Sequence, residues 1–170
     1  MGTVTAVSDE ALADLIADLT QRGLTIATAE SLTGGGLVAR LVDVPGASHV
    51  VRGGACTYAV DTKASVLGVS ESQLALTGPV DEQVARQMAR GARELFRADI
   101  GVSTTGVAGP GPADGFPAGT VHIACVHPAG EEHRLLHLDG DRAAVRAGAI
   151  DAAIALVRDV LDFAGVQVGD

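Results

Sequence analysis

Aromatic residues are scarce in this chain of 170 residues. They make up 2% of the sequence, Trp is absent and Tyr58 is the sole tyrosine. Hydrophobic residues nevertheless reach 47%, so Ala, Val, Leu and Ile must fill the core. Small side chains allow helices to pack closely on a sheet, and the length suits one core. We therefore expect a single domain over residues 1–170.

The chain also lacks an excess of basic residues and a long apolar run. Its formal net charge of −9 argues against a broad nucleic-acid surface, although a local phosphate site remains compatible with it. No apolar stretch is long enough to span a bilayer, and no signal-peptide pattern is present. We expect a cytoplasmic protein with no nucleic-acid or membrane partner. The only two cysteines, Cys56 and Cys125, lie in strand-like runs and are expected to be buried thiols rather than a disulfide.

Lysine is the scarcest charged residue. Of the 12 basic residues, only Lys63 is a lysine. Arginine stays protonated at any working pH, whereas a desolvated lysine can lose its proton and act as a base. Lys63 is therefore a candidate base, and the alternative is a surface lysine retained by chance.

Helical and strand-like patterns alternate along the chain. Such interleaving favours an α/β fold with helices on both faces of the sheet, and a hairpin near the end makes the sheet mixed. The spacing of apolar residues, together with capping residues, predicts the boundaries. Helices are expected at 8–23, from 37 to about 45, and at 61–67, 70–76, 79–97 and from 141 onwards; strands are expected at 24–29, 50–58, 100–104, 120–126 and 134–138.

A polar, glycine-rich turn at residues 28–36 separates the first predicted strand from the following helix. In open α/β folds, ligands bind at this carboxyl edge of the sheet. Glycine lets backbone N–H groups approach a ligand, and a helix N-terminus favours an anion. Ser31 would be presented there as a nucleophile. The alternative is an ordinary helix start, in which Ser and Thr act as caps.

A second glycine-rich turn, at residues 104–111, also follows a predicted strand. Two such turns at one sheet edge would form a cradle for a phosphate or for a developing oxyanion. Neither turn has the spacing of a Walker P-loop or of a dinucleotide-binding fingerprint. An ordinary surface loop is the alternative for the second turn.

Tyr58 and Lys63 lie at the end of the second predicted strand and in the helix after it. Together with Ser31 they supply a nucleophile, a base and a phenol that relays or steadies a proton. A Ser–Lys pair carries out acyl transfer without histidine when burial lowers the pKa of the lysine. Arg142 and Arg146, one helical turn apart, could clamp a phosphate or carboxylate, or could form an exposed helix face.

The five histidines do not form a metal-binding pattern. None stands at ligand spacing from Cys or Glu, so we expect no metal site. Solvated strand faces explain His122, His127, His133 and His137 better. No histidine has a sequence context that singles it out for a Ser-His-Asp triad.

A further pattern extends over five segments, at residues 28–35, 45–48, 54–63, 105–110 and 119–121. Together they resemble the CinA C-terminal domain family, the nicotinamide-nucleotide amidases. The resemblance runs from about Leu12 to Leu161 and indicates the stand-alone form of the domain. It implies a three-layer α/β/α fold, no metal, no cofactor and a homo-oligomer. The implied reaction is hydrolysis of nicotinamide mononucleotide to nicotinate mononucleotide and ammonia.

The resemblance also implies roles for individual residues. Ser31 matches the motif serine, Lys63 the base and Tyr58 its neighbour, while Ser48 could assist or could itself be the nucleophile. Arg142 would serve the phosphate. The full set of residues expected to bind substrate is Glu30, Thr33, Gly34, Gly35, Ser48, Thr105, Gly106, Gly109 and Arg142.

The sequence departs from the family pattern at three places. Leu32 stands where a cysteine is usual, and Ala59-Val60 replaces a Ser-Asn pair. The loop at 111–118 lacks the usual double glycine and Lys-Pro. These departures leave two alternatives open: a binding or regulatory module that has lost catalysis, and an amidase of another small amide.

Overall fold

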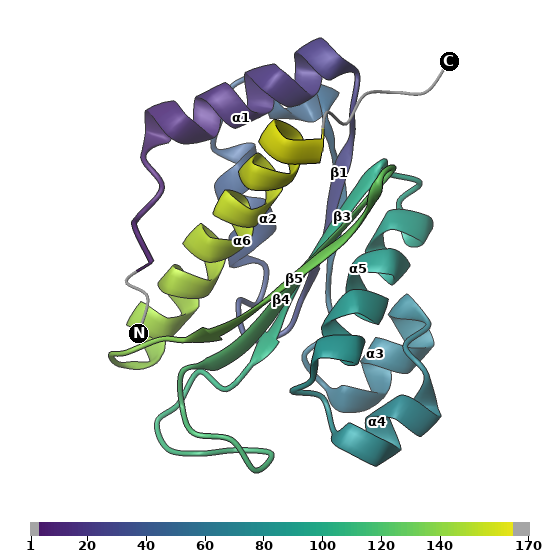
Figure 1. Ribbon diagram of the computed structural model, residues 1–170, viewed down its shortest axis with the longest axis vertical. Coiled ribbons are helices and arrows are strands. Elements are labelled where there is room, and N and C mark those ends of the chain that lie inside the picture. Colours follow the sequence, from purple (N-terminus) through teal and green to yellow (C-terminus); the bar gives the residue numbers. More distant parts are fainter. Residues whose placement is uncertain (1–3, 165–170) are drawn as a thin grey trace.

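The computed structural model describes residues 4–164, which form five strands and six α-helices (Figure 1). The order of elements follows the predicted alternation. The bounds are α1 Asp9–Arg22, β1 Ile26–Glu30, α2 Gly36–Val42, the 3-10 turn η1 Ala47–His49, β2 Val51–Cys56, α3 Val60–Leu67, α4 Glu71–Thr77, α5 Glu82–Leu95, β3 Ile100–Gly106, β4 Thr120–His127, β5 Gly130–His137 and α6 Arg142–Ala164.

The five strands form one mixed sheet in the order β2-β1-β3-β4-β5. β1 runs parallel to β2 and β3, and β4 and β5 complete the sheet as an antiparallel hairpin. In register, Glu30 pairs with Cys56 on one side and with Thr104 on the other. The carboxyl ends of β1, β2 and β3 therefore meet at one edge of the sheet.

Helices cover both faces of the sheet, so the predicted three-layer α/β/α fold is confirmed. Helices α1, α2 and α6 lie over one face, and α3, α4 and α5 lie over the other (Figure 1). Alternation along β1 divides the core: Ile26 packs with the α1/α2/α6 layer, and Ala27 and Ala29 pack with α3 and α5.

The ends of the helices follow from local chemistry. Ser8 Oγ accepts the Ala11 N–H at the start of α1, and Gly23 ends that helix in the left-handed conformation, as predicted. Helix α5 begins later than predicted, because Asp81 accepts the N–H groups of Gln83 and Val84 and so acts as its N-cap. Pro79 and Val80 consequently lie outside the helix and line a pocket.

Two glycines allow α5 to pack directly on its neighbours. A Cβ atom built on Gly101 of β3 would lie 2.0 Å from the Ala89 carbonyl oxygen of α5. A Cβ atom on Gly91 of α5 would lie 2.1 Å from the Leu67 carbonyl oxygen at the end of α3. The lack of a side chain at these two positions lets α5 lie directly against β3 and α3.

The two cysteines differ in burial. Cys125 lies inside the sheet on β4, and burial raises the pKa of its thiol to about 12. The predicted burial of Cys56 is wrong: it is exposed, because β2 is an edge strand with a neighbour on one side only. Both thiols are free. Within residues 4–164, no helix combines the length and hydrophobicity needed to cross a bilayer.

Candidate active site

Ser31 and Lys63 meet at the carboxyl edge of the sheet. Ser31 is the first residue after β1, and its backbone N–H donates to the Thr104 carbonyl at 3.0 Å. Lys63 lies on α3 with its side chain fully buried. Its Nζ lies 3.0 Å from Ser31 Oγ and also donates to the Thr57 carbonyl. The amine of Lys63 is thereby held against the serine hydroxyl.

The surroundings of Lys63 favour its neutral form. Burial lowers the pKa of the amine from 10.5 to about 8, and the negative charge of Asp114 acts in the opposite direction. With this pKa, about a tenth of the protein carries the neutral amine at pH 7. Lys63 can therefore act as a general base near neutral pH, which an arginine could not.

The pair opens into a pocket of about 230 Å³ between the two glycine-rich turns. The walls come from the ends of β1 and β3, the segment 79–80, helix α3, the start of α6 and the loop 107–114. Among the residues predicted for the site, the pocket is lined by Ser31, Tyr58, Lys63, Thr105, Gly106, Gly109 and Arg142.

Arg142 joins two walls of the pocket at its mouth. One guanidinium nitrogen donates to the Gly109 carbonyl of the β3–β4 loop. The other donates to the Tyr58 hydroxyl at 2.9 Å, which fixes the exposed phenol after β2. Thr105 anchors the opposite wall by donating from Oγ1 to the Pro79 carbonyl at 2.8 Å.

Glu30 has a different place from the one expected. It is fully buried and does not line the pocket. Its carboxylate accepts the backbone N–H groups of Gly35, Leu37 and Val38 at 2.8–3.0 Å. Glu30 therefore caps α2 from inside the protein and fixes the turn that carries Ser31.

Thr33, Gly34 and Gly35 also lie outside the pocket lining. Thr33 Oγ1 lies 2.7 Å from both the Glu30 carboxylate and Thr104 Oγ1, and Gly34 and Gly35 adopt positive φ angles of 58° and 93°. These residues shape the turn that carries Ser31.

Ser48 lies at the opposite edge of the sheet. It is an exposed residue of η1, immediately before β2, and Val51 at the start of β2 pairs with Ile26 at the start of β1. Within the chain, Ser31 is the serine beside Lys63 and Ser48 is not.

Arg146 does not join Arg142 in a clamp. It donates from Nε to the Leu32 carbonyl at 2.9 Å and from Nη2 to the Thr33 carbonyl at 3.0 Å. It thus ties α6 to the turn after β1. Asp114, which sequence reasoning missed, does line the pocket. The Asp114-Gly115 dipeptide, a common turn sequence, was the available signal.

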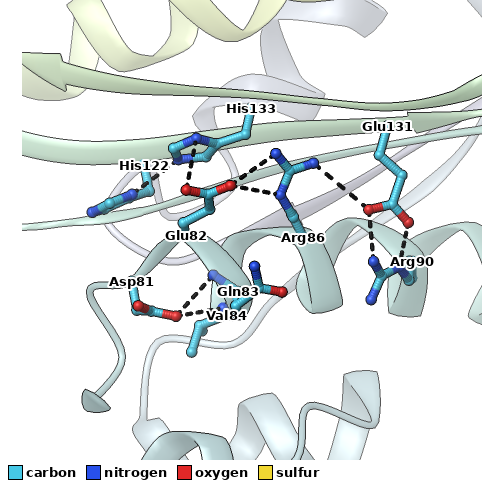
Figure 2. A network of polar contacts seen from close by, with 9 residues as sticks. All are labelled: Asp81, Glu82, Gln83, Val84, Arg86, Arg90, His122, Glu131 and His133. Atoms are coloured by element: carbon cyan, nitrogen blue, oxygen red, sulfur yellow. Dashed lines mark hydrogen bonds and ion pairs between the residues drawn. The ribbon is translucent and has the colours of Figure 1, made fainter.

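The expectation of solvated strand faces is wrong for His122 and His127, which are buried, whereas His133 is half-buried and His137 is exposed as expected. His122 is 8% exposed because α5 covers its face of β4, and His127, on the opposite face, is 5% exposed beside Leu156 and Val160 of α6. His122 Nδ1 and His133 Nε2 share a hydrogen bond of 3.0 Å with their rings stacked (Figure 2). Burial is the main cause that lowers the pKa of both rings.

Charged side chains on α5 face these histidines (Figure 2). Glu82 lies 3.7 Å from His133 Nδ1 and also binds Arg86, which extends to Glu131 of β5. Arg90 makes a bidentate contact with the same Glu131. This network fastens α5 to the hairpin, and no group of residues within 4–164 is arranged to hold a metal ion.

These features define a three-layer α/β/α protein in which a buried lysine contacts a half-buried serine at the carboxyl edge of the parallel strands. The model of the CinA C-terminal domain family matches residues 9–161. The chain therefore belongs to the CinA C-terminal domain family.

Relatives and solved structures agree with this membership. A CinA-like protein of Frankia casuarinae is 49% identical over 84% of this chain, and a putative competence-damage inducible protein of Desulforamulus reducens is 41% identical over 92%. The chain spans 33% and 38% of those two proteins, about a third of their length.

Solved structures of similar size match the whole fold. The competence/damage inducible protein CihA of Agrobacterium tumefaciens superposes with a TM-score of 0.87 at 35% identity, covering 95% of this chain and 99% of that one. A competence or damage-inducible protein of Enterobacter asburiae gives a TM-score of 0.83 at 33% identity, covering 88% and 96%.

Proposed function

We propose that the protein is an amidohydrolase that converts nicotinamide mononucleotide to nicotinate mononucleotide and ammonia. The observation that carries the proposal is the fully buried Lys63 amine, 3.0 Å from Ser31 Oγ in a pocket. An amine with a pKa of about 8 next to a serine hydroxyl is the arrangement that Ser–Lys acyl transfer needs.

In the first half-reaction, neutral Lys63 accepts the proton of Ser31 as Oγ attacks the carboxamide carbon. The carbonyl oxygen becomes an oxyanion. Ala108 and Gly109 line the pocket, and within residues 4–164 their backbone N–H groups make no hydrogen bond, so we assign them as oxyanion donors. One such donor contributes about 3 kcal/mol to lowering a barrier of this kind.

Collapse of the tetrahedral intermediate breaks the carbon–nitrogen bond. The Lys63 ammonium returns its proton to the leaving nitrogen, and ammonia departs from the acyl-enzyme. In the second half-reaction, neutral Lys63 takes a proton from water, which attacks the ester carbon. Collapse of the second tetrahedral intermediate breaks the bond to Ser31 Oγ, which takes the proton back from Lys63 as the product leaves.

The remaining pocket residues bind the rest of the substrate. Arg142 at the mouth supplies positive charge for the phosphate, since arginine is suited to phosphate recognition. The Tyr58 hydroxyl accepts from Arg142 and holds it toward the pocket. We further infer a homo-oligomer in the cytoplasm; two free thiols, one of them exposed, fit a reducing compartment.

The test is ammonia release from nicotinamide mononucleotide by the purified chain. Ser31→Ala and Lys63→Arg are each expected to lose at least about a thousandfold in kcat, because they remove the nucleophile and the base. Ser72→Ala, an exposed serine on α4, is the matched control and is expected to keep full activity.

Three results would argue against this function. Near-normal turnover in Lys63→Arg would remove Lys63 from the mechanism. Loss of activity in Ser48→Ala with activity retained in Ser31→Ala would show that Ser48, and not Ser31, is the nucleophile. Binding of the mononucleotide without ammonia release would favour a binding or regulatory module, and turnover of other amides alone would favour a different amidase.

A further inference from the structure

The loop that closes the pocket holds one acidic side chain in a fixed turn. Ala113 and Phe116 exchange two backbone hydrogen bonds, of 3.0 and 2.9 Å, across Asp114 and Gly115. The φ angles of Asp114 and Gly115 are 51° and 82°, as in the tight turns that join paired strands. Asp114 is therefore presented to the pocket by a hydrogen-bonded turn.

The ionisable side chains that line the pocket differ in whether they have a hydrogen-bond partner. Its ionisable lining residues are Tyr58, Lys63, Asp114 and Arg142. Arg142 donates to the Tyr58 hydroxyl and to a backbone carbonyl, and Lys63 donates to Ser31 and to another carbonyl. Asp114 makes no hydrogen bond or ion pair with any residue from 4 to 164. The pocket thus presents one unpaired carboxylate near the Ser–Lys pair and one arginine at its mouth.

We propose that Asp114 selects substrates that carry a positive charge on the ring bearing the reacting amide. The pocket would then prefer pyridinium amides to neutral amides of the same shape. This inference rests on the proposed function and names the determinant of its substrate class. A cation beside Asp114 and an anionic group toward Arg142 together describe a zwitterion.

Desolvation of the Asp114 carboxylate favours a cationic ring over a neutral one. A ligand that fills the pocket removes water from the Asp114 carboxylate, which is costly unless an opposite charge replaces that water. A pyridinium ring supplies this charge, whereas a neutral ring leaves the carboxylate uncompensated. Asp114 is exposed in the free protein, so its carboxylate is hydrated until a ligand covers it.

The same pairing acts on the base. Without substrate, the Asp114 charge favours the ammonium form of Lys63. A bound cation cancels this field and repels the ammonium, so Lys63 gives up a proton to the buffer as the substrate enters. The positive charge of the substrate therefore helps to generate the neutral amine that removes the proton from Ser31.

The experiment uses two ligands that differ in ring charge. Nicotinamide mononucleotide has a pyridinium ring, and its 1,4-dihydro form has a neutral ring with the same amide and phosphate. Calorimetric titration into Ser31→Ala, which cannot turn them over, gives both dissociation constants. We expect the pyridinium form to bind about tenfold more tightly, as one partly screened charge pair provides.

Asp114→Asn in the same background should bring the two dissociation constants to within about twofold of each other. Asn tolerates a positive φ angle, so the turn is kept. Asp14→Asn, an exposed change on α1 with the same loss of charge, should keep the tenfold ratio. An unchanged ratio in Asp114→Asn, a ratio near one in the Asp114 protein, or binding of neither ligand would each overturn the proposal.

Proton release supplies an independent readout. Titrations at pH 7 in buffers of different ionisation enthalpy should show net proton release with the pyridinium ligand and none with its dihydro form. The ammonia assay separates this proposal from the proposed function. Charge-selective binding without ammonia release would reject the proposed function alone. Ammonia release, together with an unchanged preference for the pyridinium ligand in Asp114→Asn, would reject the role of Asp114 alone.

Discussion

Lys63 Nζ lies 3.0 Å from Ser31 Oγ although the two residues are 32 positions apart in the chain. The contact depends on the parallel pairing of β1 with β2, which brings the end of β1 and the start of α3 to one sheet edge. No local motif joins the two side chains. The consequences of this contact can be measured in both activity and stability.

The first prediction concerns the pH dependence of activity. Because the pKa of Lys63 is about 8 and the neutral amine is the base, kcat/KM should rise with pH and level off above about pH 8. The measurement is initial ammonia release between pH 6 and 10. A profile that is flat across pH 8, or that rises only near pH 10.5, would contradict the role of Lys63.

The second prediction is that Lys63→Met stabilises the protein at neutral pH. A pKa lowered from 10.5 to about 8 corresponds to a cost of about 3 kcal/mol for burying the ammonium at pH 7. Loss of the donor to the Thr57 carbonyl offsets about 1–2 kcal/mol of this gain. Urea unfolding at pH 7 should therefore show a gain of about 1–2 kcal/mol.

The advantage of Lys63→Met should shrink as the pH rises. Between pH 8 and 10.5 the folded protein binds fewer protons at Lys63 than the unfolded chain, so the stability of the Lys63 protein increases with pH in this range. Unfolding at pH 7 and pH 10 tests the sign. A methionine variant that gains nothing at pH 7, or gains equally at both, would show that the amine is not strained by burial.

The third prediction concerns Glu30. Glu30→Gln replaces a carboxylate that accepts three backbone N–H groups with an amide that has one acceptor oxygen. We expect a loss of about 2–4 kcal/mol in the free energy of unfolding and a fall in kcat, because the turn carrying Ser31 loosens. The matched control is Glu10→Gln in the exposed first turn of α1, expected to change stability by less than about 0.5 kcal/mol.

The fourth prediction tests the direct packing of α5 against β3. Gly101→Ala places a Cβ atom 2.0 Å from the Ala89 carbonyl, so α5 must move away from β3. A loss of about 3 kcal/mol or more is expected in chemical unfolding. Gly148→Ala on α6 is the control, because its Cβ meets only the Leu138 side chain, at 3.3 Å or more. A small effect at Gly101 would mean that the layer is more loosely packed than described.

The fifth prediction concerns acid stability. The pKa values of His122 and His133 are lowered from 6.5, mainly by burial, so the unfolded chain binds more protons than the folded protein below that pH. Stability should therefore fall as pH drops below 6.5. Protonation of both rings opposes their contact, although Asp81 and Glu82 favour the charged forms.

His133→Gln should reduce the fall in stability between about pH 6.5 and 5. His49→Gln, an exposed change in η1, is the matched control and should leave the slope unchanged. Thermal unfolding across the range gives the measurement. An equally steep loss of stability with falling pH in His133→Gln would show that other groups cause the acid sensitivity.

Much of the fold could be predicted because its signals are local. Ser8, Gly23 and the apolar stripe of α1 lie within one segment, and the alternation of helices and strands implied a layered sheet. Lys63 and Ser31 were selected by residue chemistry. Their contact needed the sheet register, which the sequence supported only through the family resemblance.

The sequence was less informative where the surroundings of a residue depend on how other segments fold around it. The carboxylate of Glu30 accepts three backbone N–H groups of the turn and helix that follow and also binds the Thr28 and Thr33 hydroxyls. Cys56 was expected to be buried, because a sequence pattern does not reveal which strand lies at an edge. The burial of His122 depends on α5, a layer whose position no strand periodicity specifies.

The cap that Glu30 provides has a consequence for engineering. Cutting this side chain back to alanine would leave three converging N–H groups around an empty, positively polarised hole just large enough for a small oxyanion. Acetate, formate or sulfate in the medium would then restore the missing stability in proportion to its concentration. A turn that evolved to be self-sufficient could in this way be converted into a sensor for dissolved anions.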